Sequence, residues 1–116
     1  MPVSDGFVAF VLEQLEPLGP LTSKRMFGGV GLYAGDSFFA LIAADVLYLK
    51  GDAATREARE KAGARPFQPP NRPPGTGKNQ YYSVPAAILE DDDALLAWAK
   101  QSIEIAGAQH SEPRPP

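Results

Sequence analysis

The stretch of the sequence most suggestive of chemistry is PPGTGK, residues 73–78, which ends like the phosphate-binding loop of an ATPase. Such a loop reads G-x-x-x-x-G-K-[ST], because its glycines surround a phosphate, its lysine reaches the outer phosphates and its hydroxyl holds Mg²⁺. Here Arg72 stands in place of the first glycine and Asn79 in place of the hydroxyl. The stretch also leads into a predicted strand, whereas a phosphate-binding loop opens a helix. The sequence therefore predicts an ordinary loop and no nucleotide site.

The other residues with catalytic potential do not form a recognisable reactive set. The chain has no cysteine, which excludes disulfides, thiolate chemistry and cysteine-based zinc sites. Its one histidine, His110, lies near the C-terminus without the fixed partner that a general base needs. Asp91, Asp92 and Asp93 stand at a predicted helix start, where they complement the helix dipole but point in different directions. We therefore expect a protein that is not an enzyme and that uses no cofactor and no metal.

Length and composition indicate a single globular domain. The chain has 116 residues, of which 44% are hydrophobic and 22% charged. Its net charge of -3 argues against a sequence-independent nucleic-acid binder, which usually has a basic surface. The N-terminus does not resemble a signal peptide, and no apolar run reaches the roughly 20 residues of a membrane-spanning helix. We expect a cytoplasmic protein that does not contact a membrane.

Hydrophobic periodicity predicts a helix near each end of the chain and a short one between them. The first helix follows Ser4 or Asp5, either of which can cap it, and Gly19-Pro20 ends it. The short, charged helix spans residues 52–62 and ends at a glycine. The last helix begins near Ala86, and its packing stripe consists of Leu95, Leu96, Ala99, Ile103 and Ala106.

Residues 24–50 have the pattern of short strands joined by tight turns. Gly35-Asp36 and Asp45 are turn signals, and the run SFFALIAA, residues 37–44, is apolar on both faces, as expected of a central strand. In VLYLK, residues 46–50, Leu47 and Leu49 face one way and the other three residues face the other way. After a proline-rich segment, NQYYSV returns to the sheet.

Together these elements predict an α+β domain of two layers. An antiparallel sheet of about five strands packs against the N- and C-terminal helices, in the order helix, three or four strands, helix, one or two strands, helix. The domain is expected to cover residues 1–106, and residues 107–116 are expected to form a disordered tail, because they have little to bury.

Three segments, RMFGGVGLY, FFALIAADVLYLK and YYSVPAAILEDDDALLAWA, resemble the N-terminal domain of the TfoX/Sxy competence regulators. Many members of that family are small stand-alone proteins. The resemblance covers residues 4–106, and the combination of its motifs is specific. It implies a two-layer α+β domain, a homodimer and a regulatory association rather than a known reaction. The full-length regulators carry a further C-terminal domain, which these 116 residues do not include.

The first candidate interaction site is the glycine-containing segment Arg25, Met26, Phe27, Gly28 and Gly29. It offers a cation, two large apolar groups and a backbone that a partner can approach closely. The same residues also suit a purely structural strand, in which Phe27 packs in the core and the glycines permit a bend.

The second candidate site consists of Tyr48, Lys50, Lys78, Tyr81 and Tyr82, which lie near one another if their strands pair. Basic groups among aromatic rings can stack nucleobases or hold an anion, although tyrosine is also common on a half-exposed sheet face. We expect first a regulatory domain that binds an unidentified protein through its open sheet face or an edge strand. The second hypothesis is a module for a nucleic acid or small anion, which is not favoured and which would use Arg25 with these lysines and tyrosines.

Overall fold

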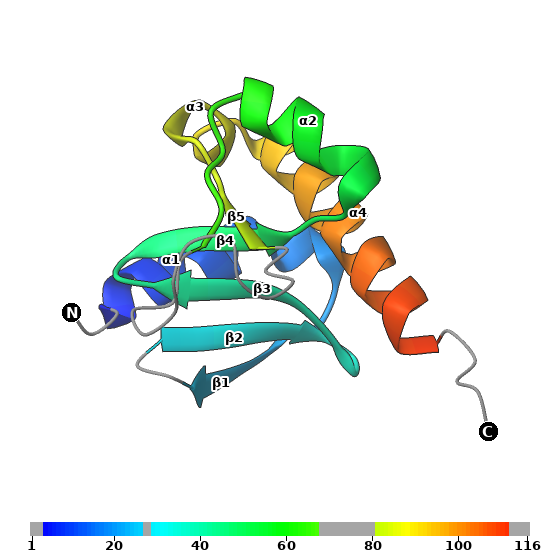
Figure 1. The fold of residues 1–116 in the computed structure, drawn as a ribbon. Coiled ribbons are helices and arrows are strands. Elements are labelled where there is room, and N and C mark those ends of the chain that lie inside the picture. The colour runs from blue at the N-terminus through cyan, green and yellow to red at the C-terminus, as the bar shows by residue number, and fades with distance from the viewer. Residues whose placement is uncertain (1–3, 27–28, 68–80, 112–116) are drawn as a thin grey trace.

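The computed structural model describes residues 4–26, 29–67 and 81–111. These residues form one antiparallel sheet with the strand order β1-β2-β3-β4-β5, against which the helices pack (Figure 1). The predicted two-layer α+β architecture and its order of elements are confirmed. The strands are β1 (Thr22–Met26), β2 (Gly29–Ala34), β3 (Ser37–Ala43), β4 (Val46–Lys50) and β5 (Tyr81–Ser83). The helices are α1 (Asp5–Gln14), the 3-10 helix η1 (Glu16–Leu18), α2 (Ala53–Lys61), α3 (Ala86–Leu89) and α4 (Asp92–Ser111).

The core lies between one face of the sheet and the helices α1 and α4. From the sheet it receives alternate residues of β2, β3 and β4, whose register places them on the same face. Leu47 and Leu49 are buried while Tyr48 is half-buried, which confirms the alternation predicted for β4. The buried cluster consists of Val11, Leu15, Val30, Leu32, Phe39, Ala40, Ile42, Leu47, Leu49, Val84, Leu95, Ala99 and Ala106.

A bulge in β3 decides which of its aromatic side chains enters the core. The register passes from Leu32 opposite Ala40 to Tyr33 opposite Phe38, so that Phe39 has no residue opposite it. Strict alternation from Ala40 would direct Phe38 into the core. With the extra residue, Phe39 is fully buried and Phe38 lies on the other face, beside Tyr33.

Local capping and turn interactions fix the ends of the first elements. Ser4 begins α1, because its hydroxyl accepts a hydrogen bond from the N–H of Phe7 at 3.2 Å. Its own N–H donates to Asp45 at 2.7 Å, which joins the start of α1 to the turn between β3 and β4. That turn has positive φ at both Ala44 (50°) and Asp45 (60°), as a two-residue hairpin loop that matches the strand twist requires.

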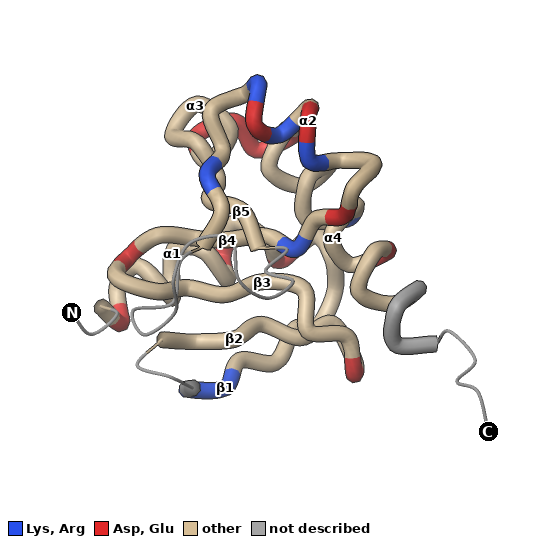
Figure 2. The backbone as a smooth tube through the Cα atoms, viewed as in Figure 1, with Lys and Arg blue, Asp and Glu red and all other residues tan. Residues whose placement is uncertain are grey.

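Helix α2 follows the predicted boundaries because both of its ends are capped. Asp52 and Thr55 form a reciprocal capping box, and Gly63 after the helix adopts a φ of 106°. Figure 2 shows the basic and acidic residues that follow one another along this helix. The proline-rich segment beyond Phe67 falls within residues 68–80 and lies outside the described residues.

The C-terminal helical region differs from the prediction in two ways. It is divided into α3 and α4, because the Asp91 carboxylate accepts the N–H of Ala94 at 3.1 Å and starts a new helix. Helix α4 then continues to Ser111, so the predicted domain boundary after Ala106 falls inside it. A single glycine at position 107 lowers helix stability by about 1 kcal/mol but breaks no hydrogen bond of the helix. The remaining tail residues, 112–116, lie outside the described part of the chain.

Within residues 4–26, 29–67 and 81–111, no helix is both long enough and apolar enough to cross a bilayer.

Candidate functional site

The face of the sheet opposite the core carries a set of aromatic side chains. Cross-strand pairing brings Tyr33 opposite Phe38 on β2 and β3, and Lys50 opposite Tyr81 on β4 and β5. All of these positions alternate with core residues, so their side chains share the other face. We call this surface the aromatic face; its members are Lys24, Tyr33, Phe38, Tyr48, Lys50, Phe67 and Tyr81.

Three rings of the aromatic face form a row across the strands. The centroids of Tyr33 and Phe38 lie 5.0 Å apart in a stacked arrangement, and those of Phe38 and Tyr81 lie 5.3 Å apart in a tilted one. The Tyr81 hydroxyl donates to the Phe38 carbonyl at 3.2 Å. Burial, together with the nearby Tyr33 hydroxyl, raises the pKa of Tyr81 to about 12, so this phenol is neutral at physiological pH.

A lysine lies over a tyrosine ring at each side of this row. The Lys24 ammonium is 5.1 Å from the Tyr33 centroid, and the Lys50 ammonium is 5.5 Å from the Tyr81 centroid, both within cation–π range. Partial burial lowers the pKa of Lys50. Across the described ranges, the ion pairs join Arg25 to Asp5 and Lys61 to Glu57, and neither lysine of the aromatic face belongs to one.

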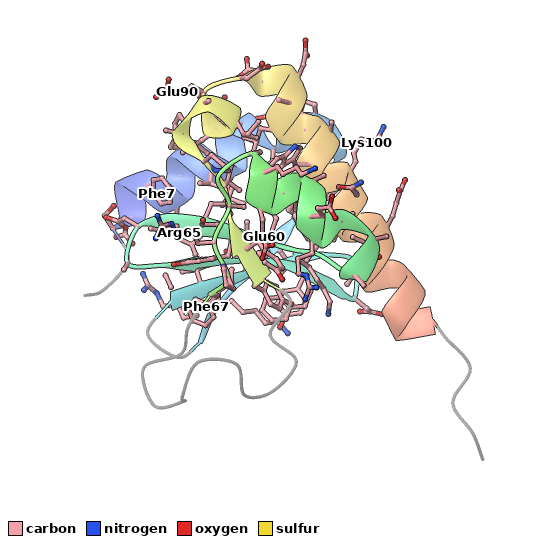
Figure 3. All side chains as sticks on the ribbon, turned by 45° about the horizontal axis from the view of Figure 1, so that its top comes forward. Phe7, Glu60, Arg65, Phe67, Glu90 and Lys100 are labelled. Atoms are coloured by element: carbon pink, nitrogen blue, oxygen red, sulfur yellow. The ribbon has the colours of Figure 1, made fainter. Side chains whose placement is uncertain are left out.

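A second aromatic pair extends the face toward the edge of β5. Phe67 meets Tyr48 edge-on, with centroids 5.0 Å apart, and its N–H donates to the Tyr81 carbonyl at 2.7 Å. Phe67 therefore packs on the face opposite the core, where its ring contacts Tyr48. Figure 3 shows Phe67 on the opposite side of the sheet from Phe7 and α1.

The structure separates the residues of the second predicted site. Tyr48, Lys50 and Tyr81 lie together on the aromatic face, whereas Tyr82 pairs with core-facing Leu49 and is 7% exposed. Adjacent residues of a strand point to opposite faces, so the two neighbouring tyrosines cannot serve one surface. Lys78 lies outside the described residues.

The first predicted site has a structural explanation where it is described. Arg25 pairs with Val30 on the helix-covered side, and its guanidinium contacts the Asp5 carboxylate at 3.1 Å. It therefore does not join the lysines of the aromatic face. A side chain at Gly29 would collide with the Ile42 carbonyl, so this glycine permits a close backbone approach. The Met26 side chain, Phe27 and Gly28 lie outside what the structure describes.

Sequence reasoning missed the most highly connected polar side chain of the structure, Arg59. It lies on α2, is 2% exposed, and donates to the Lys50 carbonyl at 2.7 Å and to the Ser102 hydroxyl at 3.1 Å. The Ser102 hydroxyl in turn donates to the same Lys50 carbonyl at 2.6 Å. Further acceptors of the guanidinium are the carbonyls of Leu49 and Trp98 and the side chain of Gln101. We call this group the Arg59 junction; it joins α2, β4 and α4.

The charge of Arg59 is stabilised by the dipoles of its carbonyl and hydroxyl acceptors and by the ring of Trp98. Its guanidinium carbon lies 5.3 Å from the Trp98 ring centroid, and no described carboxylate forms an ion pair with it. Burial lowers its pKa, which the Asp52 charge partly offsets. The available sequence signal was Ser102, a polar residue three positions after Ala99 in the apolar stripe of α4.

The two polar regions differ in what their cations contact. At the Arg59 junction the two Nη groups donate to carbonyls, a hydroxyl and an amide oxygen of the protein itself, while the buried Nε has no hydrogen-bond partner within the described part of the chain. On the aromatic face, rings and ammonium groups are partly accessible. Among the residues described, no three His, Asp or Glu side chains lie close enough to hold a metal ion.

The fold and its aromatic face define a small two-layer α+β domain with a cationic, ring-bearing sheet surface. The family model of the TfoX N-terminal domain matches residues 13–106 of the chain. The chain therefore belongs to the TfoX N-terminal domain family, which confirms the resemblance seen in its sequence motifs. No curated protein sequence matches it.

Proposed function

We propose that this chain is a non-enzymatic regulatory domain that binds another protein through its aromatic face. The single observation that supports this most strongly is the collection of half-buried rings on the sheet face opposite the helices. Aromatic side chains are enriched at protein contacts because they bury much area at low entropic cost. The resemblance of its motifs to the N-terminal domain of the TfoX/Sxy competence regulators points in the same direction.

The edges of the sheet are less suited to a partner than its face. Along β5, the backbone of residues 65–67 already pairs with the strand, through hydrogen bonds of 2.7 Å from Phe67 to Tyr81 and from Ser83 to Arg65. The other edge strand, β1, carries the adjacent cations Lys24 and Arg25. Charged residues on an edge strand oppose the addition of a further strand. We therefore place the contact on the face.

The domain is proposed to act as a homodimer that associates through its other layer. Phe10 on α1 is 41% exposed and stacks on Phe7 with centroids 6.3 Å apart. Because α1 packs on the core side of the sheet, this patch is separate from the aromatic face. Light scattering of the purified chain is expected to give twice the monomer mass, and Phe10→Ser is expected to shift the mass toward that of a monomer.

A second candidate function is the binding of a single-stranded nucleic acid or a small anion. The observation in its favour is the placement of Lys24 over Tyr33 and of Lys50 over Tyr81. It predicts binding to an oligonucleotide that weakens as the salt concentration rises. Arg25, one of the cations expected to contribute, faces Asp5 on the other side of the sheet, which leaves this function with fewer charges.

The proposed function is tested by comparing what the native chain and two variants capture from the parent cell. Phe38→Ser removes the central ring of the aromatic face, and Phe10→Ser makes the same change on α1. The proposal predicts that defined proteins bound by the native chain are lost with Phe38→Ser and retained with Phe10→Ser. Circular dichroism verifies that both variants are folded. Equal capture by all three proteins would contradict the assignment of the contact to the aromatic face.

A further inference from the structure

We infer that the aromatic face recognises an acidic peptide segment, whose carboxylates pair with Lys24 and Lys50 while its backbone lies across the ring row. This inference rests on the proposed function, since it names the chemistry of the protein partner. Three independent observations support it. They are the orientation of the rings, the lack of an ion pair to Lys24 or Lys50 among the described residues, and the distribution of charge over the sheet.

The orientation of the rings disfavours stacking by a nucleobase. Tyr33 has Phe38 stacked on it at 5.0 Å on the side of β3 and the Lys24 ammonium over it at 5.1 Å from the side of β1. Phe38 in turn lies between Tyr33 and Tyr81. A base that stacks needs a free ring face. Because the ring faces of Tyr33 and Phe38 are occupied in this way, a partner would meet their edges, which carry the positive end of the aromatic quadrupole and attract negative groups.

The two lysines lack the acceptors that a carboxylate would supply. Neither forms an ion pair with any described residue. Lys50 is half-buried, which removes part of the hydration of its ammonium and lowers its pKa. A carboxylate of the partner would give the Lys50 ammonium a charged acceptor, while the Tyr81 ring beneath it keeps the ammonium in place. Charge-assisted hydrogen bonds of this kind are stronger than neutral ones.

The charge of the sheet is opposite to that of the chain as a whole. The chain has a net charge of -3, yet the strands TSKRM, GVGLYA, SFFALIA, VLYLK and YYS contain no aspartate or glutamate. The described carboxylates lie in helices, helix starts and turns, as Figure 2 shows. Of these, Asp36 is the nearest in sequence to the ring row, because it lies in the turn between the strands of Tyr33 and Phe38. An acidic segment is therefore attracted to the strands and repelled by the rest of the surface.

The inference is tested by titrating the full chain with synthetic decaglutamate and, separately, with a thymidine decanucleotide and with inorganic phosphate. The expected result is saturable binding of decaglutamate, weakened about threefold to fivefold by Lys24→Gln and by Lys50→Gln, since an exposed ion pair contributes up to about 1 kcal/mol. Lys100→Gln on α4 makes the same charge change on an exposed helix position and is expected to leave the affinity unchanged.

Three results would overturn the inference: no binding of decaglutamate, equal weakening by Lys100→Gln, or tighter binding of the decanucleotide or of phosphate than of the peptide. The capture experiment tests the proposed function independently of this inference. If decaglutamate does not bind but Phe38→Ser still abolishes capture of defined proteins, the face is a protein contact with a different chemistry. If both experiments fail, the aromatic face is not the contact surface.

Discussion

The Arg59 junction and the aromatic face both place a cation against an aromatic ring, at 5.3 Å for Arg59 and Trp98 and at 5.5 Å for Lys50 and Tyr81. They differ in what surrounds the cation. Arg59 is 2% exposed and donates to backbone carbonyls, a hydroxyl and an amide oxygen of two other elements, β4 and α4. The lysines of the aromatic face have no ion pair among the described residues.

This difference distinguishes a cation that stabilises the fold from cations that are available for recognition. A buried cation whose acceptors are all internal contributes to folding, and its removal takes a hydrogen-bond donor from each of those acceptors. A partly exposed lysine without an acceptor contributes little to folding and keeps its capacity for a partner. Lys50 belongs to both regions, because its carbonyl accepts from Arg59 and from Ser102 while its side chain lies over Tyr81.

The largest effect is expected from Arg59→Ala. The substitution removes the guanidinium bonds to the Lys50 and Trp98 carbonyls, although the Lys50 carbonyl keeps the bond from Ser102. It also opens a cavity between α2, β4 and α4, so we expect a loss of about 3–5 kcal/mol in the free energy of unfolding. Urea denaturation measures it. Arg56→Ala, at an exposed position of the same helix, is the control and should change stability by less than about 0.5 kcal/mol. Similar values for the two variants would show that the junction is not a stabilising element.

A smaller loss of about 1–3 kcal/mol is expected from Ser102→Ala. This fully buried hydroxyl accepts from Arg59 at 3.1 Å and donates to the Lys50 carbonyl at 2.6 Å. Because the two residues share acceptors, their effects should not add: the double variant with Arg59→Ala should lose less than the sum of the single losses. Denaturant unfolding of the three variants gives the coupling energy, and strict additivity would contradict a connected junction.

On the aromatic face, the ionisation of Tyr81 is expected to lower stability only at high pH. Its folded-state pKa of about 12 lies above the usual 10.0, so the folded chain holds a proton that the unfolded chain releases. The stability that Tyr81 contributes is therefore present below pH 10 and is lost as the pH rises from about 10 to 12. Burial also raises the pKa of Tyr48, so the test is the part of the late phenolate absorbance that disappears in Tyr81→Phe. This variant also loses about 1 kcal/mol with its hydrogen bond to Phe38. Unchanged titration would contradict the burial of this phenol.

The smallest effect on stability is expected from Lys24→Gln, the aromatic-face counterpart of Arg59→Ala. Lys24 is exposed and lies over Tyr33, so its removal should change the free energy of unfolding by less than about 1 kcal/mol. Thermal unfolding of the variant tests this. A loss as large as that of Arg59→Ala would show that the two regions do not differ in the way described.

Features encoded by neighbouring residues could be predicted from the sequence. The cap at Ser4, the alternation of β4 and the boundaries of α2 all depend on residues within a few positions of one another. The order of the elements could be predicted because each helix and strand has its own hydrophobic periodicity. The family was visible because its motifs recur together over most of the chain.

Features that depend on distant pairing could not be predicted. Arg59 appears in the sequence as one of several charges in a polar helix, and its acceptor Ser102 lies 43 residues further on. The sequence predicts that Arg25 and Tyr82 share a surface with the lysines and tyrosines of the sheet, and this is wrong. Which face each side chain occupies depends on the strand register, and the sequence alone does not determine it. The bulge at Phe39 likewise decides the side of Phe38 without any glycine to mark it.

The most direct test of the account is an NMR titration of the native chain with decaglutamate that follows ring signals in both regions. The account predicts that the resonances of Tyr33, Phe38 and Tyr81 shift with increasing peptide, whereas the indole signal of Trp98, at the Arg59 junction, stays in place. A shift of the Trp98 signal without a shift of those three rings would contradict the assignment of recognition to the aromatic face.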